Sequence, residues 1–169
     1  ALDLRRGERQ VASVAWRHLA REVERGGPVP YDALCTALHQ LGGILKDRGV
    51  RGLIEPRGFA HSTLRDFATA RRAIDDTYGP AVFGIVHDTF HAHLAGDPHI
   101  SADHVAVIHV SGVSATDDGA LQDQDRHLLD AQDRLNSVDQ VNTLRAAGCT
   151  APVSFECFAP QVQNDPGRQ

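Results

Sequence analysis

Four residues that can bind a metal or move a proton each stand at the end of a short apolar stretch. They are Glu55, Asp88, His109 and Glu156. Three carboxylates held beside one neutral imidazole repel one another and raise each other's pKa, and a divalent cation removes this repulsion. Oxygen-rich ligation with one nitrogen suits Mn²⁺, Mg²⁺ or Co²⁺ better than a structural zinc. We therefore expect a divalent metal site with Mn²⁺ as the first candidate and Mg²⁺ and Co²⁺ as alternatives.

Histidines crowd the second of these positions, in "FGIVHDTFHAHLAG" (83–96). An aspartate at the end of a strand and a histidine three residues later can reach into one pocket, so His91 is a candidate for the same site as Asp88. Successive side chains of a strand point to opposite faces, so we expect His87 to be packed or hydrogen-bonded on the other side. His93 is expected on a loop or helix surface.

Residues so far apart in the chain need a scaffold that brings them together. Strand-like apolar stretches cover 50–56, 81–88, 104–112 and 151–158. Helical periodicity covers 62–78, a short segment after 88, and 137–148. Short apolar strands that alternate with helices predict an α/β protein with a parallel sheet, whose carboxyl-terminal strand ends share one face. In a barrel these ends also converge on the axis, where barrel active sites lie.

The remaining segments frame this α/β region. Residues 8–25 and 31–48 predict two helices ahead of the first strand, although residues 1–30 follow the pattern poorly. The polar tail 159–169 is expected to be frayed. We interpret residues 1–169 as a single domain.

Composition narrows the class of protein. The 169 residues are 41% hydrophobic and 23% charged, as in an ordinary soluble domain, and the net charge of -5 argues against a general nucleic-acid or anionic-membrane surface. No apolar run approaches the ~20 residues of a membrane span, and no signal peptide is visible. Three cysteines without metal-knuckle spacing indicate reduced thiols, so we expect a cytoplasmic location.

Four stretches carry a resemblance to a known family. "GLIEPRGF", "GIVHDTFHAHLAGD", "VIHVSGV" and "LRAAGCTAPVSFECFAP" occur in this order over roughly residues 40–160. Together they resemble the xylose-isomerase-like TIM-barrel superfamily in its sugar isomerase/epimerase branch, which includes ketose 3-epimerases, hydroxypyruvate isomerase and inosose dehydratase. The resemblance implies a parallel (β/α) barrel fold.

The resemblance also implies roles for individual residues. It carries Glu55, Asp88, His109 and Glu156 onto the four metal-ligand positions of the family. In the epimerases of the family the two metal-bound glutamates move the proton, which makes Glu55 and Glu156 the expected catalytic pair.

Two further positions are implied as substrate-binding. His91 falls on a substrate-contacting histidine. Arg126, in "DQDRHLLD", matches an arginine that follows the histidine strand and binds substrate oxygens. A surface position for Arg126 is the alternative, because "LLDAQDRL" stands where the family has a glycine-rich turn.

The chain departs from the family in length. A complete barrel has eight strands and about 250 residues, whereas this sequence predicts a partial barrel of about four βα units preceded by two helices, matching the last four strands of the family. An open half-barrel has unpaired edges. The chain is then a fragment of a larger protein, a half that pairs with a second copy to close the barrel, or a degenerate relative. We expect weak or no activity from an isolated monomer.

The implied function is a divalent-metal-dependent sugar or polyol isomerase or epimerase, which transfers a proton beside a carbonyl through a metal-bound enediolate. A dehydratase of the inosose type with the same site is one alternative, and a noncatalytic metal- or sugar-binding relative is another. The superfamily also contains apurinic endonucleases, but the negative net charge of this chain disfavours that activity. The expected partner is a small-molecule sugar or polyol, with no nucleic acid and no membrane.

Overall fold

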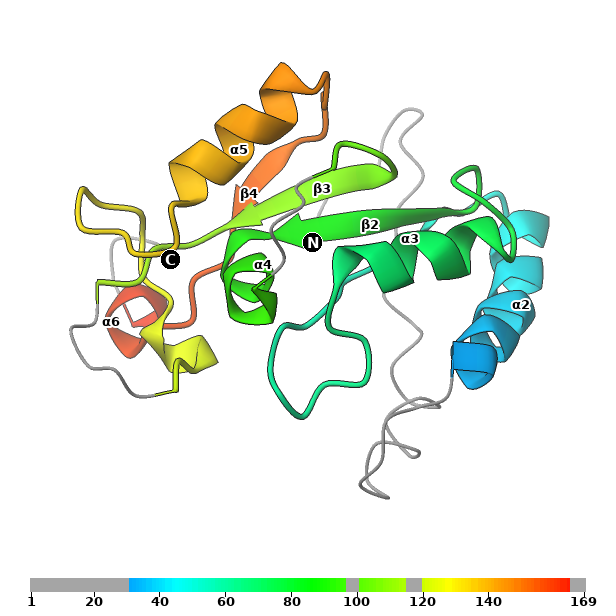
Figure 1. The fold of residues 1–169 in the computed structure, drawn as a ribbon, viewed down its shortest axis with the longest axis horizontal. Coiled ribbons are helices and arrows are strands. Elements are labelled where there is room, and N and C mark those ends of the chain that lie inside the picture. Colours follow the sequence, from blue (N-terminus) through cyan, green and yellow to red (C-terminus); the bar gives the residue numbers. More distant parts are fainter. Residues whose placement is uncertain (1–30, 97–100, 115–119, 165–169) are drawn as a thin grey trace.

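The computed structural model describes residues 31–96, 101–114 and 120–164 (Figure 1). Its four strands form one parallel sheet in the order β1-β2-β3-β4, with the bounds Gly52–Ile54, Phe83–Asp88, Val105–Val110 and Val153–Phe155. The α-helices are α2 (Tyr31–Asp47), α3 (Phe67–Asp75), α4 (Thr89–Ala95), α5 (Ser137–Ala146) and α6 (Pro160–Gln163). The predicted α/β partial barrel of four strands is confirmed. The predicted helix over 8–25 and the atypical segment 1–30 lie outside the described residues.

The helices cover one face of the sheet through two apolar clusters. Phe83 and Ile85 of β2 pack with Leu34 of α2 and Ile74 of α3, and all four are at least nine-tenths buried. In the second cluster, residues of β3 pack against α5, whose Leu144 is fully buried. Since side chains alternate along a strand, the residues between these apolar positions face the inside of the partial barrel.

Some predicted boundaries are wrong. The helix predicted over 62–78 begins only at Phe67, because Asp66 caps it by accepting a hydrogen bond from the backbone nitrogen of Thr69 at 2.7 Å. The tail expected to be frayed from residue 159 instead begins with the short helix α6, which has a proline in its first turn.

An irregularity in the pairing of β2 with β3 affects every residue beyond it. Ile85 pairs with Val105, but the next residue of β2 pairs with Val107, so Ala106 is an extra residue in β3. As a result Asp88 pairs with His109. Because side chains alternate along a strand, this β-bulge brings the carboxylate and the imidazole onto the same face.

Both outer strands leave an edge unpaired among the described residues. Every residue of β4 is exposed, and the side chain of Phe155 is 60% exposed. At the opposite edge, α2 exposes Ile44 to 55%. Unpaired edges with apolar side chains are sites where another strand or chain can pair. Among the described helices, none is long and apolar enough to cross a membrane.

Candidate metal centre

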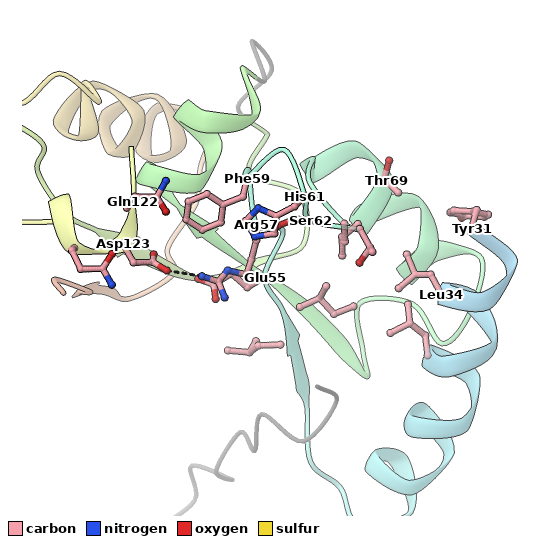
Figure 2. A pocket seen from close by; sticks show the side chains of 16 residues that line it. Tyr31, Leu34, Glu55, Arg57, Phe59, His61, Ser62, Thr69, Gln122 and Asp123 are labelled. Carbon is pink, nitrogen blue, oxygen red and sulfur yellow. Dashed lines mark hydrogen bonds and ion pairs between the residues drawn. The ribbon is translucent and has the colours of Figure 1, made fainter. Parts of the chain in front are cut away.

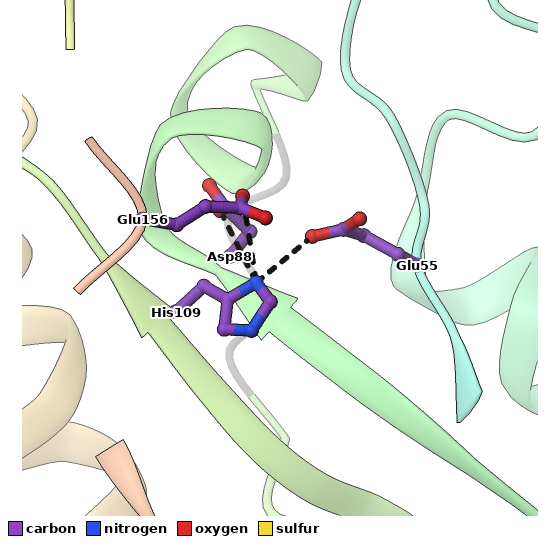
Figure 3. Close-up of side chains that lie close together, drawn as sticks. All are labelled: Glu55, Asp88, His109 and Glu156. Carbon is purple, nitrogen blue, oxygen red and sulfur yellow. Dashed lines mark hydrogen bonds and ion pairs between the residues drawn. The ribbon is translucent and has the colours of Figure 1, made fainter. Parts of the chain in front are cut away.

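The four strand-end residues meet at one point (Figure 3). Glu55 follows β1, Asp88 ends β2, His109 lies in β3 and Glu156 follows β4. Each offers one ligand atom, and these atoms all lie within 4.8 Å of one another. The predicted convergence is therefore present, because adjacent parallel strands deliver their carboxyl ends to one face. The role of these residues as metal ligands stays a prediction.

His109 lies at the centre of the cluster. Its Nδ1 is 3.3 Å from Glu55 Oε1, 3.4 Å from Glu156 Oε2 and 3.9 Å from Asp88 Oδ2. Hydrogen bonds to Glu156 and Glu55 raise the pKa of His109 to about 10, although burial opposes this shift. Three carboxylates around one nitrogen thus attract positive charge, and an oxygen-rich set of this kind fits a divalent cation.

Two of the carboxylates, Asp88 and Glu156, differ in acidity because their partners differ. Burial raises the pKa of Asp88 to about 7, against the lowering effect of Arg126. Burial also acts on Glu156, but hydrogen bonds with His109 and Asp88 and the charges of His109 and Arg126 outweigh it and lower its pKa to about 2. Glu156 is therefore ionised across the neutral range, which a proton-accepting group requires.

One carboxylate oxygen of Asp88 accepts hydrogen bonds from the backbone. Oδ1 accepts hydrogen bonds from the backbone nitrogens of Phe90 at 2.9 Å and His91 at 3.1 Å, which caps α4. The other oxygen, Oδ2, faces the cluster. The cap thus fixes the orientation of the carboxylate within the site.

Arg126 reaches the cluster from the loop after β3. Its side chain is buried, so the surface alternative is wrong. Nη2 donates to Asp88 Oδ2 and, at 2.9 Å, to Glu156 Oε2, while Nε donates to Ser111 Oγ at 3.2 Å. The guanidinium therefore ties together carboxylates from two strand ends. Its role in binding substrate stays a prediction.

His91 is buried with an unsatisfied nitrogen. The residue is 2% exposed, and its Nδ1 has no hydrogen-bond partner among the described residues. Burial lowers the pKa of His91 to about 4, so the ring is neutral. Its ring lies edge-on to Phe59, with 5.2 Å between ring centroids. A buried polar atom without a partner is costly and marks a place for a ligand group, which is consistent with the predicted substrate contact.

The neighbouring histidines, His87 and His93, lie where the sequence predicted them. His87 is buried on the opposite side of β2, where its Nε2 is 2.9 Å from Gln140 Oε1 of α5, so the prediction of a hydrogen-bonded residue is confirmed. His93 is exposed on α4, as expected.

A cavity of about 460 Å³ lies beside Glu55 and was not foreseen from the sequence (Figure 2). Its polar wall includes Arg57 and Asp123, which lie beside Phe59, and an ion pair of 2.8 Å joins Arg57 Nη2 to Asp123 Oδ2. The only hint in the sequence was an arginine two residues after a strand-end glutamate. The pairing of two loops 66 residues apart has no sequence signature.

Gly58 allows the loop after β1 to lie against α4. A Cβ atom at this position would be 2.1 Å from the backbone oxygen of His91 and 2.7 Å from the backbone nitrogen of Ala95. We expect Gly58→Ala to lower the free energy of unfolding by about 1–3 kcal/mol, because backbone atoms must move apart. Urea unfolding measures this loss. Gly43→Ala is the control, since its Cβ would come no closer than 3.4 Å to another residue. Equal stabilities of the two variants would contradict the expectation.

Comparison with known proteins agrees with this geometry. The family described as xylose isomerase-like TIM barrel matches residues 7–169. A xylose isomerase domain containing protein from Salmonella typhimurium LT2 is 30% identical, with a TM-score of 0.75 over 81% of this chain and 52% of its own. No curated protein matches the chain.

Two less similar solved structures share the fold. The IolI protein with a binding zinc atom is 23% identical, with a TM-score of 0.65 over 78% of this chain and 48% of its own. The 3-keto-D-glucoside 4-epimerase YcjR from E. coli is 18% identical, with a TM-score of 0.57 over 84% of this chain and 52% of its own. The chain thus spans about half the length of these structures.

Proposed function

Since the chain belongs to the xylose isomerase-like TIM barrel family, we propose that it is a divalent-metal-dependent isomerase or epimerase of a sugar or polyol. The observation that carries this proposal is the convergence of three carboxylates and one imidazole at the carboxyl ends of four parallel strands. The neighbouring structures include a zinc-bound protein and an epimerase. The bound zinc of the first and the epimerase activity of the second support this class of activity.

The proposed ligands are the four residues of the cluster, and a divalent cation held there would polarise the carbonyl of a substrate. Mn²⁺ remains the first candidate, and Mg²⁺, Co²⁺ and Zn²⁺ are to be compared with it. Glu55 and Glu156 are the proposed proton-transfer pair. They approach His109 from the two outer strands of the sheet, β1 and β4, so the two carboxylates flank the space above it (Figure 3). One glutamate then removes the proton beside the carbonyl and the other returns a proton.

Arg126 and His91 complete the proposed site. Arg126 positions Glu156 by its hydrogen bond of 2.9 Å and provides positive charge where a substrate oxygen becomes negative. The neutral imidazole of His91, whose Nδ1 has no partner in the described part of the chain, provides a hydrogen-bonding group for a substrate hydroxyl. Both roles follow from their contacts and burial.

Isotope exchange tests the proposal without knowledge of the product. The chain, supplied with Mn²⁺, is incubated in D₂O with a panel of ketoses and aldoses, and NMR follows deuterium uptake beside the carbonyl. Metal-dependent exchange is the expected result. Loss of water from the sugar would instead identify the dehydratase alternative. If elemental analysis finds the ion bound and no sugar exchanges, the chain is a noncatalytic relative.

A second copy of the chain is the proposed partner that completes the barrel. A two-fold axis along the barrel would pair β4 of one copy with β1 of the other in parallel orientation, and α2 of one copy would then cover the outer face of β4 of the other. The exposed Phe155 on β4 and the exposed Ile44 on α2 fit this contact. Such an arrangement supplies the missing half of the pocket.

This pairing of two copies predicts the mass of the protein in solution. Sedimentation at several concentrations should give twice the mass of one chain, and Phe155→Glu should halve it, because a charge would be buried in the interface. Val138→Glu is the matched control, since Val138 is 57% exposed in the first turn of α5, a helix that packs against β3. A strict monomer at every concentration rules out the pairing.

A further inference from the structure

The cavity beside the cluster has a polar wall and an apolar wall (Figure 2). Glu55 belongs both to the cluster and to the cavity lining, so a sugar held at the cluster would extend its remaining carbons into this space. Leu53, Ile54 and Leu64 contribute apolar surface. Which sugars can enter this space is a question that rests on the proposed function.

One carboxylate on the polar wall is shared by two guanidinium groups. Asp123 Oδ2 accepts from Arg57 Nη2 at 2.8 Å, and Asp123 Oδ1 accepts from Arg126 Nη1 at 3.3 Å. The side chains of Arg57 and Asp123 are 37% and 28% exposed, so a ligand can reach both. Asp123 therefore neutralises positive charge between the cavity and the cluster.

This charge balance favours an uncharged ligand. Arg57 is the only arginine or lysine among the described residues that line the cavity, and it is already paired. A phosphate or carboxylate would have to displace Asp123 from Arg57 and would be repelled by both Asp123 and Glu55. A hydroxyl group is uncharged, so the two carboxylates do not repel it and Asp123 need not leave Arg57. It can donate a hydrogen bond to Asp123 while this carboxylate stays paired with Arg57.

We propose that the Arg57–Asp123 pair makes the site selective for uncharged sugars, and that Asp123 is the residue that excludes phosphorylated and carboxylated sugars. Discrimination of this kind comes from repulsion of the wrong ligand as well as attraction of the right one. Phe59 adds to the same wall, since the guanidinium of Arg57 lies 5.4 Å from its ring centroid. The apolar C–H face of a sugar can pack on this ring.

Binding of inorganic phosphate to the metal-free chain tests the exclusion without any turnover. Asp123→Asn keeps the shape of the side chain but removes its charge, and should bind phosphate roughly tenfold more tightly than the unmodified chain, the scale expected for removal of a nearby like charge. The double variant Arg57→Gln with Asp123→Asn should return to the original affinity. Asp139→Asn, on the first turn of α5, changes the net charge equally and should have no effect. Titration calorimetry measures all four proteins.

Measurement of turnover provides a second test of the proposed selectivity. With Mn²⁺ present, Asp123→Asn should raise kcat/KM for a ketose 6-phosphate relative to the uncharged ketose. The proposal is overturned if Asp123→Asn binds phosphate no more tightly than the unmodified chain, or if the double variant keeps the gain. If phosphate binding changes as expected but no sugar exchanges its protons, the proposed enzymatic function fails while the charge selectivity stands.

Discussion

Glu156→Gln is expected to reduce turnover by about 10²- to 10⁴-fold, the contribution typical of general acid–base catalysis. The amide has nearly the same shape and can still accept the hydrogen bond that Arg126 gives to Glu156 Oε2 at 2.9 Å. It cannot accept a proton from carbon. Deuterium exchange and conversion of the most reactive sugar measure the loss.

The paired variant Glu55→Gln should show a loss of similar size, because each carboxylate serves one half of the proton transfer. Metal content is measured on both variants and excess Mn²⁺ is supplied, so that weaker binding of the ion is separated from loss of the base. Asp139→Asn provides the control for loss of an acidic side chain elsewhere. Full turnover by Glu156→Gln on every sugar tested would remove Glu156 from the mechanism.

Binding of Mn²⁺ is expected to strengthen about tenfold for each pH unit between pH 7 and 9, because one proton leaves as one ion binds. The pKa of His109 is raised to about 10 by Glu156 and Glu55, so in the metal-free chain its imidazole stays protonated over this range. A metal ligand must be neutral imidazole. Below pH 7 the dependence should steepen, because the pKa of Asp88 is raised to about 7 and a second proton must leave.

Titration calorimetry in buffers of different ionisation enthalpy counts the released protons. His109→Gln should bind Mn²⁺ more weakly and lose the dependence above pH 7. The stability of the folded metal-free chain depends on pH with the opposite sign. A raised histidine pKa stabilises the metal-free chain at low pH, and this contribution is lost as the pH rises through about 10. A Mn²⁺ affinity that is constant between pH 7 and 9 would contradict the protonated state assigned to His109.

The cluster was predictable from sequence for a geometric reason. Glu55, Asp88, His109 and Glu156 stand at strand ends, and parallel strands bring such ends to one face whatever their separation in the chain. The strands and the later helices were predictable from apolar periodicity. These features depend on local patterns repeated along the chain.

The loops were not predictable, because their paths depend on contacts between distant residues. The helix was predicted to begin at residue 62, but Arg65 donates two hydrogen bonds to the backbone oxygen of Gly58, and the helix starts only after the Asp66 cap. Arg57 was overlooked because its partner Asp123 lies on a different loop. A single sequence records neither contact.

The extra residue in β3 sets a limit on how this family member can change in length. If Ala106 instead paired with Val86 and the bulge were absent, Asp88 would lie opposite Ile108, so an isoleucine would replace the imidazole at the cluster and His109 would turn toward α5. Loss of Ala106 alone would close the bulge and keep Asp88 opposite His109, whereas loss of two residues would shift the pairing by one and reverse the alternation. Substitutions and the loss of the bulged residue can therefore accumulate in evolution, but the loss of two residues from this strand is expected to be eliminated by selection.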